Sequence, residues 1–140
     1  MNRVLEQQRA KYALDEIMEI NKKPDKTFKK DYASLVRRIP TMILNNGLGQ
    51  TLAFLLSKQN KDKDAECLYG QLQTWLCGTN TPEDKNRFPR RIYIGSTPDL
   101  IGQIMGNDRH KYIHAQVEAM SLLNWMKKFA DAYLPQDDNK

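Results

Sequence analysis

Two histidines with helical spacing are the residues of this 140-residue chain best suited to binding a metal ion. His110 and His114 lie four positions apart, which would place both imidazoles on one face of a helix. The zinc-hydrolase pattern also needs a glutamate directly after the first histidine as general base, and this chain has Lys111 there. Asp108 or Glu118 would have to supply the third ligand. We therefore expect solvent-facing histidines, no metal site and no zinc-dependent hydrolase.

The other patterns that suggest chemistry are incomplete. Gly47 and Gly49 begin a dinucleotide-binding fingerprint, but Leu52 occupies the third glycine position and no strand is expected before it. Cys67 and Cys77 form no CxxC pair, and ten positions along one helix would hold them about 15 Å apart, too far for a disulfide. No serine stands in a Gly-x-Ser-x-Gly elbow. The sequence therefore predicts a protein that is not an enzyme and needs no cofactor.

Charge is the next informative feature, because it is unevenly distributed. The net charge is +5, and residues 1–63 carry 13 lysines and arginines against 7 acidic residues, whereas residues 64–140 carry 9 against 10. A positive excess in one half favours a polyanionic partner such as nucleic acid. An ordinary solvated basic surface is the alternative, since net charge alone does not identify a partner.

Apolar residues recur at helical spacing through most of the chain and predict an all-α fold. We expect a single-domain compact bundle over residues 1–134 with about six to seven helices, a long C-terminal helix, an irregular loop at 79–96 and a disordered tail at 135–140. The expected helices cover 3–21, 25–38, 40–46, 48–58, a segment ending at Gly78, 97–105 and 108–134. No apolar run reaches the ~18 residues of a membrane span, and the N-terminus lacks the apolar centre of a signal peptide, so we expect a cytoplasmic protein without membrane contact.

Two positions in the middle of the chain should interrupt these helices. Pro40 removes a backbone donor and disfavours helical geometry at Ile39, which predicts a helix end or kink there. Asn45, Asn46 and Gly47 suit a left-handed turn before the strongly apolar segment 48–58. That apolar segment is expected to be the central helix, and a sharp corner should precede it.

Trp125 does not fit the apolar stripe of the last expected helix. At 100° per residue it falls on the polar side, together with Lys111, His114, Glu118, Ser121 and Lys128. An exposed indole there would suit a protein interface or stacking on unpaired bases. Alternatively, the first helix or the long loop covers it.

Several motifs occur in an order that resembles one family. They are Ile-Pro-x-Met-Ile at 39–43, Asn-Gly-Leu-Gly-Gln-x-Leu-Ala-Phe-Leu-x-Ser-Lys at 46–58, Leu-Tyr-x-x-Leu-x-x-Trp-Leu at 68–76 and Leu-Leu-x-Trp-Met-Lys-Lys-Phe-Ala at 122–130. Over roughly residues 3–134 the chain closely resembles the small subunit of the Cmr complex, the type III-B CRISPR-Cas effector. The segment 79–96 matches no motif of that family.

The resemblance implies a non-catalytic, all-helical subunit of a crRNA-guided ribonucleoprotein that targets RNA. Its partners would be the backbone RAMP subunits, the large polymerase-like subunit, crRNA and target RNA, and copies of the subunit would stack on one another. A free-standing helical nucleic-acid-binding or regulatory protein is the alternative. It would need a recognition helix preceded by a short turn, and none is evident.

Candidate contacts follow from charge and position. Six basic residues of the positive half that end or flank expected helices are predicted RNA phosphate contacts: Arg9, Lys11, Lys29, Arg37, Arg38 and Lys58. For Arg37, Arg38 and Lys58 the alternative is a local interaction with the negative end of a helix dipole. Tyr69 and Trp125 are the predicted protein-interface residues.

Overall fold

The computed structural model describes residues 4–78 and 99–135. Within these ranges the chain forms five helices and no strand: α1 (Leu5–Asn21), α2 (Lys26–Lys58), α3 (Lys63–Cys77), α5 (Leu100–Gly106) and α6 (Arg109–Tyr133). The all-α class and the long C-terminal helix are confirmed. The expected six to seven helices exceed the five of the described part, because segments expected as three separate helices form α2. The expected loop at 79–96, the helix start at Thr97 and Pro98, and most of the expected tail lie outside the described residues.

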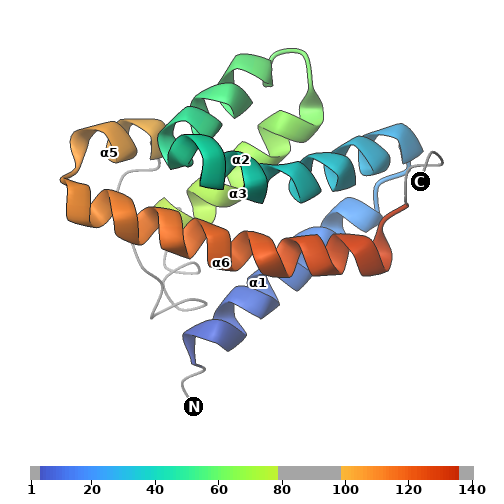
Figure 1. Cartoon of the computed structure of the whole chain (residues 1–140). Helices are drawn as coiled ribbons and strands as arrows, with labels where there is room; N and C mark the ends of the chain where they lie inside the picture. Colours follow the sequence, from blue (N-terminus) through green and yellow to red (C-terminus); the bar gives the residue numbers. More distant parts are fainter. Residues whose placement is uncertain (1–3, 79–98, 136–140) are drawn as a thin grey trace.

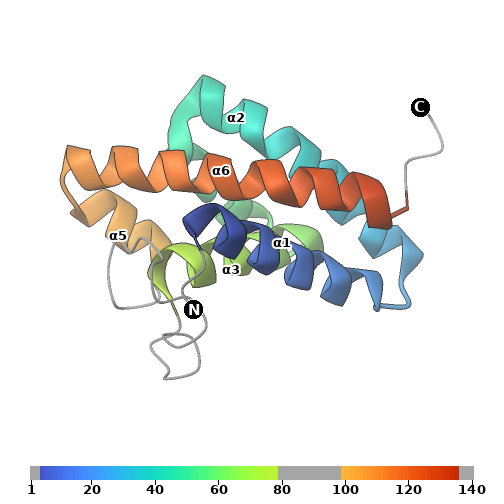
Figure 2. The same ribbon diagram turned by 90° about the horizontal axis from the view of Figure 1, so that it is seen from below.

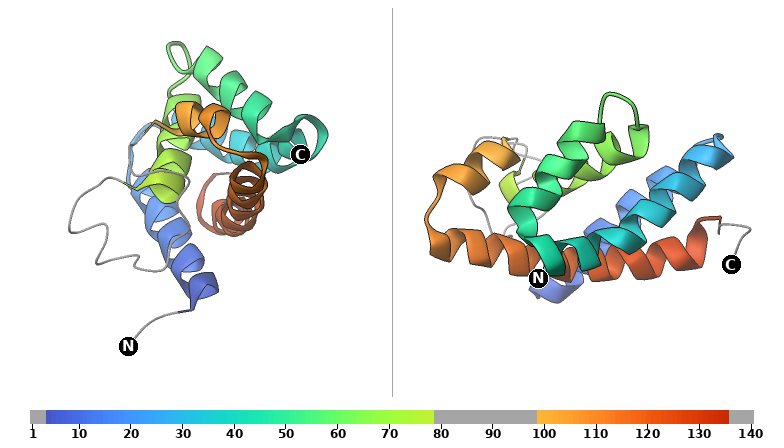
Figure 3. Two further views of the ribbon diagram at one scale, coloured as in Figure 1. Left: turned by 90° about the vertical axis from the view of Figure 1, so that its left-hand side faces the viewer. Right: turned by 45° about the horizontal axis from the view of Figure 1, so that its top comes forward.

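The long helix α6 is the element on which the others are arranged. Figure 1 shows α6 running across the molecule, with the first half of α2 above it, and Figure 2 shows α1 alongside it when seen from below. The most extensive packing joins α6 to α1 and α2, and joins α2 to α3. The left view of Figure 3 looks nearly along α6 and shows α2 and α5 above it, while α1 passes on its left and continues below it.

The expected corner before residue 48 is confirmed. Gly47 has φ 86° and ψ 163°, a backbone conformation that side chains disfavour, and α2 changes direction there. A break in a helix leaves the next few backbone N–H groups without helical partners. Two side chains of α6 accept from them: Leu48 N donates to Gln116 Oε1 at 2.9 Å, and Gly49 N donates to Tyr112 Oη at 2.8 Å. The corner is therefore fixed by α6 as well as by its own glycine.

Pro40 does not end a helix, so the predicted helix end there was wrong. Pro40 lies inside α2, and the flanking residues Ile39 and Ile43 are at most 1% exposed. A proline in a helix interior costs about 3 kcal/mol, whereas burying one isoleucine side chain contributes about 1.5–3 kcal/mol. Burial of these neighbours offsets the lost hydrogen bond, and the helix continues.

The core centres on large aromatic residues of α1, α2 and α3. Trp75 and Tyr32 are fully buried, and the rings of Tyr12 and Trp75 lie 5.0 Å apart. The Tyr12 hydroxyl donates to the backbone oxygen of Gln71 at 2.8 Å, and the Tyr32 hydroxyl donates to the side-chain oxygen of the same residue. Burial raises the pKa of Tyr32 well above its ordinary value, which keeps this hydroxyl a donor.

The remaining helix ends agree with their sequence signals except at α5, which begins at Leu100 and so later than the expected start at residue 97. Gly78, at φ 80°, follows α3 as expected. Asp99 and Asp108 cap α5 and α6 by accepting from Gly102 N and Lys111 N. None of the described helices is long and apolar enough to cross a bilayer.

Candidate nucleic-acid interface

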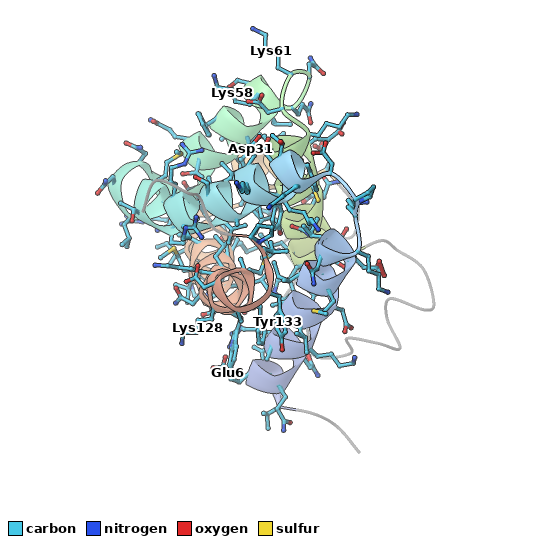
Figure 4. All side chains as sticks on the ribbon, turned by 90° about the vertical axis from the view of Figure 1, so that its right-hand side faces the viewer. Glu6, Asp31, Lys58, Lys61, Lys128 and Tyr133 are labelled. Atoms are coloured by element: carbon cyan, nitrogen blue, oxygen red, sulfur yellow. The ribbon has the colours of Figure 1, made fainter. Side chains whose placement is uncertain are left out.

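Two of the six predicted phosphate contacts converge on one pocket. Arg38 comes from the first half of α2 and Lys58 from its last turn, and both side chains are exposed. Because α2 turns back at Gly47, the two residues line the same pocket despite their separation in sequence. Figure 4 shows Lys58 and Lys61 at one end of the molecule, with Glu6 and Lys128 toward the other.

This pocket, called the Phe54 pocket below, has a volume of about 360 Å³. It combines apolar, cationic and anionic side chains; its lining residues are Leu35, Arg38, Phe54, Lys58, Asp62, Asp64 and Ala65. Lys58 Nζ lies 6.0 Å from the centre of the Phe54 ring. Burial raises the pKa of Asp64 above its ordinary value, so that carboxylate is partly removed from water.

Arg9, another predicted phosphate contact, is held inside the protein. Its Nε donates to Glu118 Oε2 at 2.7 Å and its Nη2 donates to Glu118 Oε1 at 2.8 Å, while the Trp75 indole donates to Oε2 at 2.8 Å. The Glu118 side chain is 1% exposed and that of Arg9 15%. The hydrogen bond to Glu118 raises the pKa of Arg9, with burial acting in the opposite direction. The structure therefore gives Arg9 an internal partner that joins α1 to α6.

The remaining three predicted phosphate contacts have partners of their own. Lys11 pairs with Asp15 at 3.2 Å on the exposed face of α1. Lys29 Nζ donates to the backbone oxygen of Asn21 at 3.3 Å. Arg37 pairs with Asp131 of α6 at 3.2 Å and keeps a side-chain exposure of 20%. The structure does not bring these three residues to the Phe54 pocket.

The two predicted interface residues lie in different surroundings. Tyr69 is only 8% exposed, and its hydroxyl accepts from Ile101 N at 3.0 Å, so it anchors the start of α5. Trp125 is half-buried, and its indole donates to Glu6 of α1 at 2.5 Å. The first helix thus covers part of Trp125. This agrees with the alternative, stated from the sequence, that another segment covers the indole.

The sequence of the chain matches one known family. A model of the CRISPR-associated protein (Cas_Cmr5) family matches residues 5–133, from the start of α1 to the end of α6. The chain belongs to this family. It is a small subunit of a type III-B Cmr complex, part of a CRISPR defence system, as its motifs indicated.

The histidine pair of this Cmr small subunit lies on the surface. His110 and His114 are exposed, with ring centres 5.0 Å apart. In the described ranges no group of three or more histidine, cysteine, aspartate or glutamate side chains is placed to hold a metal ion. Cys67 and Cys77 are both free thiols.

Sequence reasoning missed two features of the small subunit. Glu118 was assigned to the polar side of α6 with Trp125, yet it is buried among Ala115, Ala119 and Leu122. Its position between apolar residues three and four places away was the available signal. Phe54 was expected only as part of the apolar segment 48–58, and its half-buried place at the edge of the core was not foreseen. The four-residue step to Lys58, which places both on one helix face, was the available signal.

Proposed function

We propose that this chain is a non-catalytic structural subunit of the Cmr effector ribonucleoprotein, which stacks along the complex and helps bind target RNA in crRNA-guided antiviral defence. Membership of the Cas_Cmr5 family supports its place in the Cmr complex. The observation that carries the RNA contact is the convergence of Arg38 and Lys58 on the Phe54 pocket from two halves of α2. We also propose the cytoplasm as its location.

The proposed contact uses charge rather than base recognition. Arginine and lysine side chains on rigid helices bind phosphates and fix the position of a strand, but they carry no sequence information. In a guide-directed effector, pairing between guide and target supplies that information. Binding by this subunit should therefore be weak, sensitive to salt and nearly indifferent to sequence.

Two other predicted contacts remain in this proposal with a lesser role. Lys11 binds Asp15 and Lys29 binds the backbone oxygen of Asn21, and an ammonium group has three N–H donors, so both can also bind a phosphate. Arg9 is not included, because its guanidinium is committed to Glu118 inside the protein.

The protein contacts of the proposed assembly would use the outer side of α6. The Trp125 ring stacks on Phe129 at 5.7 Å, and Lys128 Nζ lies 5.7 Å from the centre of the Trp125 ring. A partly exposed tryptophan on a rigid helix is a typical interface anchor. We assign this surface to a neighbouring protein subunit, either a backbone subunit, the large subunit or a second copy. Tyr69 is left out because it is buried.

The experiment is capture of target RNA by the assembled complex. We expect the double variant Arg38→Gln, Lys58→Gln to enter the complex normally and to hold target RNA less tightly than wild type. The difference should be largest at about 50 mM salt and shrink toward about 200 mM, where phosphate contacts contribute less. Retention on a filter at several RNA concentrations measures it.

A matched control removes the same kind of charge elsewhere. Arg109 and Lys111 are exposed on α6 and do not line the Phe54 pocket, and the double variant Arg109→Gln, Lys111→Gln should capture RNA as wild type does. Equal capture by wild type and the double variant at every salt concentration would contradict the proposed contact. Failure of the wild-type chain to copurify with Cmr subunits and crRNA would contradict the proposed place in the complex.

A further inference from the structure

The composition of the Phe54 pocket is unusual for a site that binds phosphate alone. Two cations, Arg38 and Lys58, share its lining with two carboxylates, Asp62 and Asp64. The charges balance, so the interior offers a phosphate little net attraction, and the carboxylates repel it directly. A ligand that fits must place an uncharged part inside and its anionic parts beside the two cations.

The apolar part of the lining suits a flat ring. Phe54 is half-buried, and Leu35 and Ala65 add apolar surface beside it. A volume of about 360 Å³ falls at the lower end of the roughly 300–1,000 Å³ usual for small-ligand sites. A pocket of that size accommodates one nucleotide better than a larger ligand.

Lys58 places a positive charge close to the Phe54 ring. Its ammonium lies 6.0 Å from the Phe54 ring centre, at the outer limit of a cation–π contact, so the ring holds it only weakly. A base stacked on Phe54 would bring its own phosphate toward this ammonium. Single-strand-binding proteins commonly pair an aromatic stacking surface with cations that follow the backbone.

We propose that the Phe54 pocket receives one unpaired base of an RNA strand, which stacks on Phe54 while Arg38 and Lys58 bind the phosphates on either side of it. Asp62 and Asp64 keep phosphate out of the interior and so select the base for it. Stacking tolerates any base, because every base has a π-face, so the pocket adds affinity without a sequence preference. The inference rests on the proposed function, since it requires that the subunit contacts RNA.

The test compares strands with and without bases. The full-length chain is titrated with a fluorescein-labelled, unstructured RNA and with an abasic strand of the same length and backbone charge. Removing an aromatic stacking partner costs about 1–3 kcal/mol per base, which corresponds to at least about five-fold in affinity. We expect wild type to bind the RNA at least about five-fold more tightly than the abasic strand. Equal affinity for both strands would overturn the proposal without the use of any variant.

Phe54→Leu then assigns the effect to the pocket. This variant keeps an apolar side chain, and its circular dichroism and thermal unfolding are compared with those of wild type. We expect at least about five-fold weaker RNA binding, unchanged binding to the abasic strand, and an unchanged dependence on salt, because no phosphate contact is removed. Phe54→Tyr retains the ring and should bind RNA within about two-fold of wild type.

The outcomes separate this inference from the proposed function. If wild type binds RNA and Phe54→Leu binds it equally well, the base pocket is overturned and the phosphate contacts stand. An equal loss on RNA and on the abasic strand also overturns it, because Phe54 would then act through the fold. If wild type binds neither strand, alone or in the assembled complex, the proposed RNA contact fails and the pocket fails with it.

Discussion

Arg9 and Glu118 stand 109 positions apart in the chain and form a two-point ion pair inside the bundle. The arginine comes from α1 and the glutamate from α6, and the Trp75 indole of α3 donates to the same carboxylate. Three helices therefore meet at one buried charge. Such a pair is costly to desolvate but more costly to break, because the remaining charge then lacks a counter-charge.

The first prediction concerns the loss of that counter-charge. Glu118→Gln keeps the side-chain shape but removes the carboxylate that binds the Arg9 guanidinium at two points, so that only the exposed Glu6 carboxylate at 3.9 Å remains. We expect the free energy of unfolding to fall by about 3 kcal/mol, which urea denaturation followed by circular dichroism measures. Glu66→Gln, an exposed glutamate on α3, serves as control and should change it by less than about 0.5 kcal/mol.

A double variant tests whether the two residues act as a unit. Arg9→Met combined with Glu118→Leu removes both charges and leaves apolar side chains in their place. We expect this double variant to be more stable than either single variant, as found when buried ion pairs are replaced as a whole. Strictly additive losses would show that the pairing contributes little.

The second prediction concerns the corner of α2. Gly47 has φ 86°, and a Cβ built on it would lie 3.2 Å from the Tyr112 hydroxyl oxygen. Gly47→Ala should lower the free energy of unfolding by about 1–3 kcal/mol, because a side chain strains this backbone conformation. Gly70→Ala is the control: it lies in α3 with no atom within 4 Å of its added Cβ, and we expect it to stabilise the protein by up to about 1 kcal/mol. Equal changes in the free energy of unfolding at Gly47 and Gly70 would contradict the conclusion that the corner requires glycine.

The behaviour of Gly47 and Pro40 shows what sequence could predict. The Asn-Asn-Gly turn depends on local steric preferences, so the corner was predictable from the residues on either side of it. The effect of Pro40 depends on how deeply Ile39 and Ile43 are buried, and that burial is produced by helices distant in sequence. The sequence therefore predicted that the fold is all-α and that a corner lies at Gly47. It did not predict that α2 continues through Pro40.

The candidate site shows the same division. The sequence identified Arg38 and Lys58 as basic residues near helix ends, but only the reversal of α2 brings them to one pocket. It equally suggested Arg9, whose partner Glu118 lies 109 positions away. Charge and spacing along the chain do not distinguish a cation facing solvent from one paired across the fold.

The third prediction compares two adjacent arginines that the sequence treated alike. Arg38 is exposed at the Phe54 pocket, whereas Arg37 pairs with Asp131 across to α6. For a single strand, the logarithm of affinity falls with the logarithm of salt concentration by about 0.7 per phosphate contact. We expect Arg38→Gln to reduce that slope by about 0.7 and Arg37→Gln to leave it unchanged. Fluorescence titrations at several salt concentrations measure both.

Arg37 has its own expected effect on stability. A partly exposed ion pair contributes about 0–1 kcal/mol, so Arg37→Gln should lower the free energy of unfolding by no more than that. A reduced salt slope for Arg37→Gln with no change for Arg38→Gln would show that Arg37, and not Arg38, binds phosphate. The RNA contact would then lie where α2 packs against α6.

The fourth prediction concerns the pH dependence of Cys67. Burial, with a smaller contribution from the nearby Glu16 carboxylate, raises the pKa of this thiol from 9.0 to about 11. The thiolate is the reactive form, so alkylation by iodoacetamide near pH 8 should be about 100-fold slower in the folded protein than in the unfolded chain. In a Cys77→Ala variant, Cys67 is the sole cysteine, and the rate measured against pH gives its pKa directly.

The sign of the accompanying stability change follows from the same shift. Well below pH 9 the thiol is almost wholly protonated in both the folded and the unfolded state, so Cys67 adds almost no pH dependence there. As pH rises from about 9 toward about 11, the unfolded chain loses this proton before the folded one does, and the folded state loses stability. Cys67→Ala, compared with its parent in urea denaturation at neutral pH and near pH 10, should show a smaller loss of stability between them. An alkylation midpoint near 9 in the folded protein would contradict the burial of this thiol.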